Sequence, residues 1–342
     1  MSVRVAINGF GRIGRCFLRA AIHDPEIDIV AINDLGDIEN LAYLLRHDSV
    51  YRDFAGQVSV EPGVLVVGAK RIKVLNEKDP TKLPWGALTV GVVVESTGLF
   101  TDFEKAQVHL AAGAKRVVIS APAHGEHETG EHPLGATVLM GVNEEKLQTC
   151  QITSNASCTT NSASPVIAIL DEALGIEKAL LNTTHAYTAS QRIVDSPSAK
   201  DFREGRAGAQ NIIPSSTGAA IAVTKAYPQL ANKFDGISLR VPVVAGSIAD
   251  ITFISKRDTT AEEVNKILED AAKLPRWRGI FTTTREPLVS SDIIGNEHAS
   301  IADLPMTRVV GGNLVKVLAW YDNEAGYTQT LLRHVKAAGS HV

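Results

Sequence analysis

The hydrophobic pattern of the first 120 residues repeats a strand, a helix and a second strand. Short runs rich in Val and Ile alternate with stretches of helical period. The predicted elements are Val3–Asn8, Arg15–Ile22 and Ile27–Ile32, then Gly91–Glu95, Phe103–Ala112 and Arg116–Ser120. Repeated units of this kind predict an α/β fold with a doubly wound parallel sheet.

Between the two units the pattern changes. A helix is predicted at Asp37–Arg46, and short apolar runs follow between Val58 and Leu75, separated by Pro62-Gly63 and Gly68. Because Pro and Gly break such runs into turns, a local antiparallel insertion is predicted.

The second half is rich in strands and has no such repeat. A long helix, Cys158–Leu174, leads into a short strand, Ala179–Thr183, and another helix is predicted at Ala261–Ala272, with Thr260 and Glu263 as a capping box. Further strands are predicted at 236–241, 248–255, 308–310 and 313–320. The pattern predicts an α+β domain with a mixed, largely antiparallel sheet.

Two further segments of the second half are informative. The stretch from Ala189 to Asn211 has no regular pattern and is long for a structureless loop, which is typical of functional loops. A last helix is predicted at Ala325–Ala338, and Asn323 is the best candidate for its N-cap.

Composition indicates an ordinary globular chain. Its 342 residues, 44% hydrophobic and 21% charged, suffice for two domains. A net charge of −4 gives no general attraction to nucleic acid or acidic membranes, and no apolar run approaches the ~18 residues of a membrane span. The first strand begins without a targeting segment, and three irregularly spaced cysteines make no disulfide framework. We expect a soluble, cytoplasmic protein that binds neither nucleic acid nor membrane.

The first predicted strand runs into a glycine-rich turn. Gly9 permits the tight turn, Gly11 lets the backbone approach a pyrophosphate, and Gly14 permits close packing of the helix on the strand. Asp34 ends the next strand, 20 residues after Gly14, where a carboxylate accepts both ribose hydroxyls of a dinucleotide. Its charge would repel a 2′-phosphate, so NAD is favoured over NADP. The alternative is that Asp34 only ends a strand and starts a turn.

Polar residues also follow the later strands of the first half. Ser96-Thr97 comes after the strand that ends at Glu95, and Ser120 ends the next strand. Because open α/β sheets bind ligands at the carboxyl ends of their strands, both loops are assigned to the cofactor cleft of a Rossmann-type domain.

Cys158 stands among small polar residues, in SNASCTTN, at the predicted start of a helix. Free backbone N–H groups and the helix dipole stabilise a thiolate there, and a neighbouring imidazolium lowers the thiol pKa further. His185 can supply this imidazole after a helix-and-back excursion of the chain. We expect a reactive thiolate at Cys158; the alternative is a buried, inert cysteine.

Hydroxyls and arginines of the second half suit phosphate groups. Arg240 lies in an apolar strand and needs an anionic partner, and hydroxyls just before a helix can hold an anion. The candidates are Thr188, Arg206, Ser215, Ser216, Thr217, Gly218 and Arg240. Alternatively, the hydroxyls cap the helix and Arg240 pairs with a carboxylate.

Three histidines, His124, His127 and His132, lie among several glutamates and raise the question of a metal site. Interspersed Gly and Pro residues and the lack of a nearby cysteine favour a solvated loop. No metal site is predicted.

Eleven motifs together resemble one family, phosphorylating glyceraldehyde-3-phosphate dehydrogenase, across essentially the whole chain. In order they are NGFGRIGR, NDL, ESTG, SAPA, MGVN, SNASCTTN, HAYT, QNIIP, STGAA, LRVP and WYDNEAGY. The resemblance implies a homotetramer that oxidises D-glyceraldehyde 3-phosphate to 1,3-bisphosphoglycerate with reduction of NAD, a step of glycolysis. It also implies an NAD-binding Rossmann domain formed by residues 1–157 plus 323–342, to which the C-terminal helix returns, and a catalytic domain formed by residues 158–322.

The resemblance implies a role for each matching residue. Cys158 is the nucleophile that carries a hemithioacetal and then a thioacyl group, and His185 is its base and ion-pair partner. The residues implied to hold inorganic phosphate are Ser157, Thr159, Thr217 and Gly218. Those implied to hold the phosphate of the substrate are Thr188 and Arg240, with Arg206 assisting. Those implied to contact NAD are Arg12, Ile13, Asp34, Ser120 and Asn323.

Some positions depart from the family pattern. Ser162 stands where a second cysteine is common, and Ser196 replaces a leucine common in strictly NAD-dependent members, which leaves room for some use of NADP. The nearest rival is erythrose-4-phosphate dehydrogenase, or another specialised dehydrogenase of phosphorylated aldehydes. That rival typically lacks the threonine and STG motifs retained here as Thr188 and Thr217-Gly218. A regulatory or RNA-binding role without catalysis is a rival of another class, and the intact Cys158 and His185 argue against it.

Overall fold

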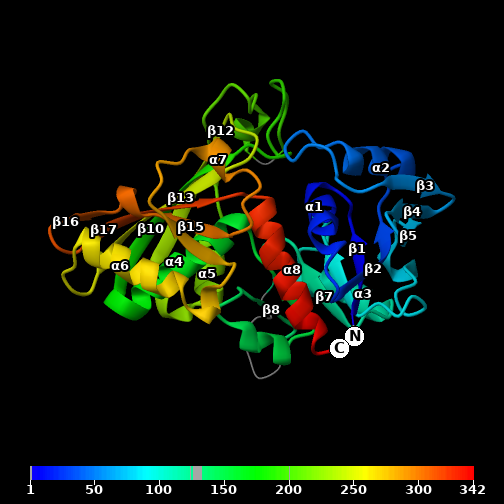
Figure 1. The fold of residues 1–342 in the computed structure, drawn as a ribbon, viewed down its shortest axis with the longest axis horizontal. Coiled ribbons are helices and arrows are strands. Elements are labelled where there is room, and N and C mark those ends of the chain that lie inside the picture. The colour runs from blue at the N-terminus through cyan, green and yellow to red at the C-terminus, as the bar shows by residue number, and fades with distance from the viewer. Residues whose placement is uncertain (1, 124, 126–132, 200) are drawn as a thin grey trace. The chain divides into compact units, whose positions relative to one another are not determined.

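The computed structural model describes residues 2–123, 125, 133–199 and 201–342. The chain divides into two compact units (Figure 1). Unit 1 comprises Met1–Val138, Glu144–Ala156 and Thr328–Val342, and unit 2 comprises Leu139–Asn143 and Ser157–Tyr327. The predicted loop histidines His124, His127 and His132 lie outside the described residues.

Unit 1 is built on one mostly parallel sheet. In the described part of the chain its strands follow the order β3 (Val58–Glu61), β4 (Val64–Val67), β5 (Lys70–Leu75), β2 (Ile27–Asn33), β1 (Val3–Asn8), β6 (Val92–Glu95), β7 (Arg116–Ile119), β9 (Ile152–Ser154) and β8 (Gly135–Thr137). The pairings from β5 to β8 are parallel, whereas β3, β4 and β5 form an antiparallel meander. The predicted doubly wound sheet and its antiparallel insertion are confirmed.

The helices of unit 1 begin where short polar or glycine residues end a loop. They are α1 (Arg12–Ala21), α2 (Ile38–Arg46), α3 (Phe103–Ala111) and, from Thr328 onward, α8 (Ala325–Gly339), with 3-10 turns at Pro80–Lys82 and Glu144–Gln148. Asp37 and Asp102 accept hydrogen bonds from the first backbone N–H groups of α2 and α3. Helix α1 starts three residues earlier than predicted, because extended backbone at Gly11 lets Arg12 open it.

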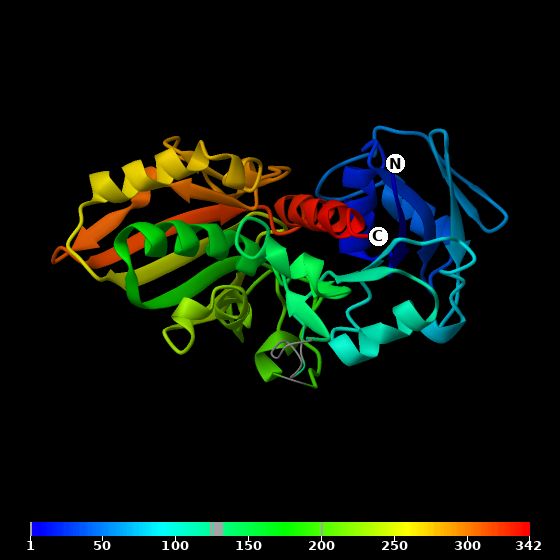
Figure 2. The same ribbon diagram turned by 90° about the horizontal axis from the view of Figure 1, so that it is seen from below.

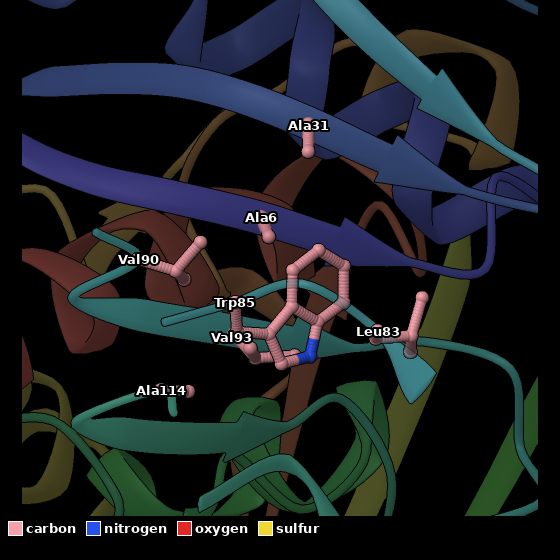
Figure 3. Close-up of a cluster of buried hydrophobic side chains, with 7 residues drawn as sticks. All are labelled: Ala6, Ala31, Leu83, Trp85, Val90, Val93 and Ala114. Atoms are coloured by element: carbon pink, nitrogen blue, oxygen red, sulfur yellow. The ribbon is translucent and has the colours of Figure 1, made fainter. Parts of the chain in front are cut away.

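An apolar cluster around Trp85 supports the sheet of unit 1 (Figure 3). The indole is fully buried, and Ala6 on β1 and Ala31 on β2 leave room for its ring. Leu83, Val90, Val93 and Ala114 complete the cluster. Small residues on the strands and one large ring from a loop therefore fill this part of the core.

Unit 2 is built on a mixed sheet. Its strands, within the described residues, follow the order β11 (Ile213–Ser216), β12 (Phe234–Val241), β10 (Ile176–Ala186), β13 (Ser247–Ser255), β17 (Leu314–Tyr321), β15 (Ser300–Asp303) and β14 (Phe281–Thr284), and β16 (Arg308–Val310) pairs with β17. The β10–β12 and β14–β15 pairs are parallel and the others are antiparallel. The prediction of a mixed, largely antiparallel sheet is confirmed, although β11, β14 and β15 were not predicted.

Helices α4 (Cys158–Leu174), α5 (Ala219–Ala226) and α6 (Ala261–Ala272) pack together with this sheet, and a short helix, α7 (Ser290–Ile293), follows. In Figure 2, α6, in yellow, runs beside the orange strands of the sheet. Because α4 contacts α5, α6 and several strands, every one of its residues from Thr159 to Leu170 is buried. Further 3-10 turns are Phe202–Gly205, Pro228–Leu230, Pro275–Trp277 and Leu304–Met306.

Two predicted caps differ in the structure. Thr260 caps α6 by accepting the N–H of Glu263, but the Glu263 carboxylate binds Arg257 and Thr259, so the predicted capping box is wrong in its second half. At the start of α8, Asp322 rather than Asn323 accepts the first N–H groups, those of Glu324 and Ala325. Asp and Asn are both preferred at helix N-caps, so residue type alone does not distinguish Asp322 from Asn323 as the cap.

No helix among the described residues is both long and apolar enough to cross a membrane. The same residues contain no cluster of three or more His, Cys, Asp or Glu side chains placed to hold a metal ion.

Candidate active site

In unit 1, a cavity of about 430 Å³ opens at the carboxyl ends of β1, β2 and β6. The chain runs from β1 to β2 on one side and returns to β6 on the other, so this is the switch point at which open α/β sheets bind ligands. The predicted cofactor residues among its lining are Gly9, Gly11, Asp34, Ser96 and Thr97.

The three glycines of the turn differ in their surroundings. Gly9 has φ +94°, and a Cβ there would lie 2.6 Å from the Thr97 nitrogen. A Cβ on Gly14 would lie 2.2 Å from the Gly9 carbonyl oxygen, whereas one on Gly11 would meet nothing within 4 Å. Gly9 and Gly14 are therefore required for packing, and Gly11 leaves the backbone open to a ligand.

Asp34 is held in place by the turn that it faces. Its Oδ2 accepts the N–H of Phe10 at 2.7 Å, and its Oδ1 accepts the N–H of Gly36 at 2.8 Å. A carboxylate has about four lone-pair sites, so two backbone donors leave capacity for ribose hydroxyls. Asp34 thus organises a turn and also lines the cavity.

Four predicted cofactor residues of unit 1, Arg12, Ile13, Gly14 and Ser120, are not among the residues that line this cavity. Ile13 lies in the first turn of α1, and Ser120 follows β7. Arg12 forms an ion pair with Asp48 at 2.5 Å. Burial acts to raise the pKa of Asp48, but hydrogen bonds from Tyr51, Arg12 and Val50 keep that pKa below its ordinary value.

In unit 2, Cys158 is the first residue of α4 and is partly buried. Ser157 caps the helix by accepting the Thr160 N–H, and the preceding Ala156 has φ 53°, a rare conformation for a residue with a side chain. Cys158 Sγ lies 3.2 Å from Nε2 of His185 on β10. His185 Nδ1 lies 2.7 Å from the Ala186 carbonyl oxygen, which only accepts, so Nδ1 carries a proton. In the neutral imidazole, Nε2 therefore offers its lone pair to the thiol.

Burial opposes charge on both partners. It raises the pKa of Cys158, although Arg240 and the N–H of Thr159 act in the other direction. It also lowers the pKa of His185 to about 3, with a further contribution from Arg240. The expected lowering of the thiol pKa is therefore wrong for this site, because the buried setting of α4 outweighs the helix N-terminus. Both shifts favour the uncharged pair, a thiol beside a neutral imidazole.

Arg240 lies on the strand next to His185. It is the register partner of His185 in the parallel β10–β12 pair. Its Nη1 donates to the Ala186 carbonyl oxygen at 3.5 Å, and its buried Nε has no hydrogen-bond partner among the described residues. A buried guanidinium edge without an acceptor is costly unless an anion from outside completes it.

The other predicted anion-binding residues make local contacts. Gly218 precedes α5, and Thr217 Oγ1 accepts the Ala219 N–H at 3.2 Å. Thr188 Oγ1 lies 3.0 Å from Ser190 Oγ. The contact of Thr217 agrees with the alternative that its hydroxyl caps α5. Binding of an anion by the N–H groups before α5 is compatible with this cap.

Arg206, which was expected to assist in binding the substrate phosphate, pairs with a carboxylate of its own loop. Its guanidinium forms an ion pair with Asp195 at 2.9 Å, with both side chains more than half exposed. Surface pairs of this kind contribute little to stability, so this pair orders the 189–211 loop at most weakly.

Tyr321 is a site residue that the sequence analysis missed. Its buried hydroxyl lies 2.8 Å from Thr159 Oγ1 and 2.7 Å from Thr183 Oγ1, and its ring meets the His185 ring edge-on at 5.9 Å. Burial raises the pKa of Tyr321, so it stays a phenol. Sheet pairing brings Thr183 to Tyr321, and the packing of α4 against β17 brings Thr159, so local sequence carried no signal for these contacts.

Asn323 joins the same group through Ser247. The Ala186 N–H donates to Ser247 Oγ at 3.1 Å, and Ser247 Oγ donates to Asn323 Oδ1 at 3.1 Å. The amide of Asn323 is thus tied to the strand that carries His185.

Comparison with known proteins gives a consistent result. Residues 3–103 match the glyceraldehyde 3-phosphate dehydrogenase NAD binding domain, and residues 157–323 match the glyceraldehyde 3-phosphate dehydrogenase C-terminal domain. Glyceraldehyde-3-phosphate dehydrogenase 1 of Bacillus subtilis is 47% identical, with 97% of each chain covered. Glyceraldehyde-3-phosphate dehydrogenase of Thermotoga maritima is 49% identical, with 96% of this chain and 97% of the relative covered. Two matching domains and near-complete coverage show that this chain belongs to the glyceraldehyde-3-phosphate dehydrogenase family.

Proposed function

We propose that this chain oxidises D-glyceraldehyde 3-phosphate to 1,3-bisphosphoglycerate, with inorganic phosphate as co-substrate and NAD as oxidant. The observation that carries the proposal is the 3.2 Å contact between Cys158 Sγ and His185 Nε2, beside an arginine whose Nε is unpartnered within the described residues. A nucleophile, a base and a cation for an anionic substrate are the parts that this reaction needs.

In the first step, Sγ of Cys158 attacks the aldehyde carbon while His185 Nε2 accepts the thiol proton. The fixed Nδ1 donation to Ala186 keeps the lone pair of Nε2 directed at sulfur. The product is a hemithioacetal whose oxygen is held by His185 and by N–H groups at the start of α4.

In the second step, the hemithioacetal carbon loses a hydride and its hydroxyl gives a proton to His185 Nε2, which leaves a thioester on Cys158. NAD, when bound, supplies the acceptor for this hydride. An oxygen of inorganic phosphate then attacks the thioester carbon, the bond to sulfur breaks, and the acyl phosphate leaves. The Cys158 thiolate recovers a proton from His185 Nε2, and the thiol and the neutral imidazole are restored.

We assign the substrate phosphate and the inorganic phosphate to residues whose charge or hydrogen-bond donors can bind an anion. Arg240 and Thr188 hold the phosphate of the substrate, because Arg240 is a half-buried cation in register with His185 and its buried Nε has no hydrogen-bond partner among the described residues. Ser157, Thr159 and the Thr217-Gly218 turn hold inorganic phosphate, and a Cβ on Gly218 would meet nothing within 4 Å. Arg206 assists only if its pair with Asp195 opens.

The residues of unit 1 fit a dinucleotide. The backbone at Gly11 is open, the Asp34 carboxylate faces the same cavity, and the N-terminus of α1 adjoins it. We assign Gly9, Gly11, Arg12, Ile13 and Gly14 to the pyrophosphate. Asp34 is assigned to the ribose, and Ser96, Thr97 and Ser120 to the remaining contacts. Asn323 is assigned to the nicotinamide amide. Residues 1–157 plus 323–342 form the NAD-binding domain of this proposal, and residues 158–322 the catalytic domain.

The proposed assembly is a homotetramer that works in glycolysis in the cytoplasm. Large apolar side chains on the 189–211 loop support an assembly, since Ile193 is 91% exposed and Phe202 is 89% exposed. Sedimentation of the purified chain at several concentrations tests this assembly, which a monomer at all of them would rule out.

The catalytic proposal is tested by steady-state assays of NADH formation with glyceraldehyde 3-phosphate and with erythrose 4-phosphate, each with and without phosphate. We expect turnover that requires phosphate and prefers the first aldehyde. Sustained NADH formation without phosphate would instead indicate hydrolysis of the thioester. Cys158→Ser should abolish turnover with either aldehyde, and a chain that is inactive before the substitution would support the non-catalytic alternative.

A further inference from the structure

A buried carboxylate lies behind the cofactor cavity of unit 1. Glu95 ends β6, is 2% exposed and is not among the residues that line the cavity. Its Oε2 accepts Asn8 Nδ2 at 2.6 Å and lies 3.0 Å from His109 Nε2. Its Oε1 accepts the N–H of Thr97 at 2.8 Å and also the Thr97 hydroxyl. Four donors therefore converge on one buried acid.

Trp85 sets the direction of the hydrogen bonds in this network. Its indole nitrogen, blue in Figure 3, can only donate, and it lies 3.2 Å from Nδ1 of the fully buried His109. His109 must then keep its proton on Nε2 and donate it to Glu95. Glu95 can serve all four donors only as an acceptor on both oxygens, that is, as a carboxylate.

From Glu95 the network crosses the carboxyl ends of three strands. Asn8 at the end of β1 accepts, on Oδ1, the Nδ2 group of Asn33 at the end of β2, at 2.8 Å. Asn33 Oδ1 in turn accepts the Glu77 N–H at 2.9 Å. Thr97 Oγ1 accepts the Leu99 N–H at 3.0 Å. The members that line the cavity are Asn8, Asn33, Glu77, Thr97 and Leu99.

We propose that Glu95 is a positioning residue for the dinucleotide, with His109 and Trp85 holding it as a carboxylate in one orientation. The proposal rests on the NAD-binding function proposed above. Glu95 acts through Asn8 and Thr97, because it orients both side chains at the edges of the cavity. Its contribution is thus to affinity for the dinucleotide and not to the chemistry at Cys158.

The substitution Glu95→Gln tests the charge with almost no change of shape. One carboxylate oxygen becomes an NH₂ group that faces N–H and O–H donors, so at least two of the four hydrogen bonds are lost. The matched control is Glu61→Gln on the edge strand β3, where Glu61 pairs with exposed Arg71. His109→Phe removes one donor from Glu95, and His109→Gln returns an N–H group near it.

The measurement is calorimetric titration of each variant of the full chain with NAD and with ADP-ribose, together with KM and kcat. For Glu95→Gln we expect the dissociation constants of both ligands to rise by the same factor, about 10-fold or more, since the lost hydrogen bonds no longer orient Asn8 and Thr97. The KM for NAD should rise while kcat at saturation stays within about 3-fold. Glu61→Gln should bind like the wild type.

If Glu95→Gln does not fold, the His109 pair decides: His109→Phe should weaken ADP-ribose binding, and His109→Gln should restore most of it. The proposal is overturned if a folded Glu95→Gln binds ADP-ribose as tightly as the wild type, or if His109→Phe and His109→Gln bind alike. A wild type that binds neither ligand would refute the proposed cofactor function itself, and with it this role of Glu95.

Discussion

Sγ of Cys158 lies 3.2 Å from Nε2 of His185, although the two residues are 27 positions apart in the chain. Helix α4 starts at Cys158, packs on the sheet and leads into β10, which runs up to His185 and Ala186. This helix–strand unit places the nucleophile at the start of α4 and its base near the end of β10. The pairing of β10 with β12 then adds Arg240 beside the base.

Arg240 should tune the reactivity of Cys158. Its positive charge lowers the thiol pKa against the effect of burial. Arg240→Gln removes that charge, so the thiolate is less favourable and the midpoint of the pH profile of iodoacetamide alkylation should move to higher pH. Arg285→Gln, at an exposed pair with Glu269, is the control and should leave the profile in place. A shift to lower pH in Arg240→Gln would contradict the account.

The second and third glycines of the glycine-rich turn, Gly11 and Gly14, should respond differently to alanine. Gly14→Ala brings a Cβ to 2.2 Å from the Gly9 carbonyl oxygen, so we expect a loss of about 1–3 kcal/mol in the free energy of unfolding. Gly11→Ala meets nothing within 4 Å and should unfold like the wild type, but its methyl group obstructs the approach of a pyrophosphate. Thermal unfolding and NAD titration of both variants check this contrast. Equal losses of stability would refute it.

Asp34 should discriminate against NADP. In Asp34→Asn the negative charge that repels a 2′-phosphate is gone, so the ratio of kcat/KM for NADP to that for NAD should rise at least several-fold. The new NH₂ group must face the N–H of Phe10 or of Gly36, so the variant should also lose about 1–3 kcal/mol of stability. An unchanged cofactor ratio would show that Asp34 acts only in the turn.

His334 should make the protein sensitive to acid. It lies on α8, fully buried between Thr153 and Asn155, and burial lowers its pKa to about 3. An unfolded histidine has a pKa near ~6.5, so between these values the unfolded chain binds a proton that the folded chain does not. Stability is therefore lost as pH falls below ~6.5, by roughly 2 kcal/mol at pH 5 for this one group.

The acid dependence is checked by unfolding at pH 7 and pH 5. His334→Asn should reduce the difference in free energy of unfolding between the two pH values, whereas the exposed His23→Asn should not. The same difference in wild type and His334→Asn would mean that His334 does not carry the acid sensitivity.

Features encoded within a few residues could be predicted from the sequence. The glycine turn, Asp34 at the end of a strand and Cys158 at a helix start each depend on local geometry, and each lies where it was expected. Short strands such as β11 and β14 were missed, because runs of three or four polar and hydroxyl residues carry little hydrophobic period.

Contacts between side chains of different strands and helices could not be predicted from the sequence. Tyr321 reaches Thr183 because β17 and β10 both pair with β13, and it reaches Thr159 because α4 packs against β17. Glu95 gathers donors from β1 and α3. The raised thiol pKa also depends on how completely the surrounding elements bury α4, which local residues do not determine.

The central claim is that Cys158 carries the acyl group between oxidation and phosphorolysis. Its most direct test is peptide mass spectrometry of the chain after incubation with NAD and glyceraldehyde 3-phosphate in phosphate-free buffer, with NADH measured in parallel. We predict about one NADH per chain, an acyl adduct on the Cys158 peptide, and loss of that adduct as acyl phosphate when inorganic phosphate is added. Continued NADH formation without an adduct on Cys158, or an adduct of the same kind in Cys158→Ser, would contradict the account.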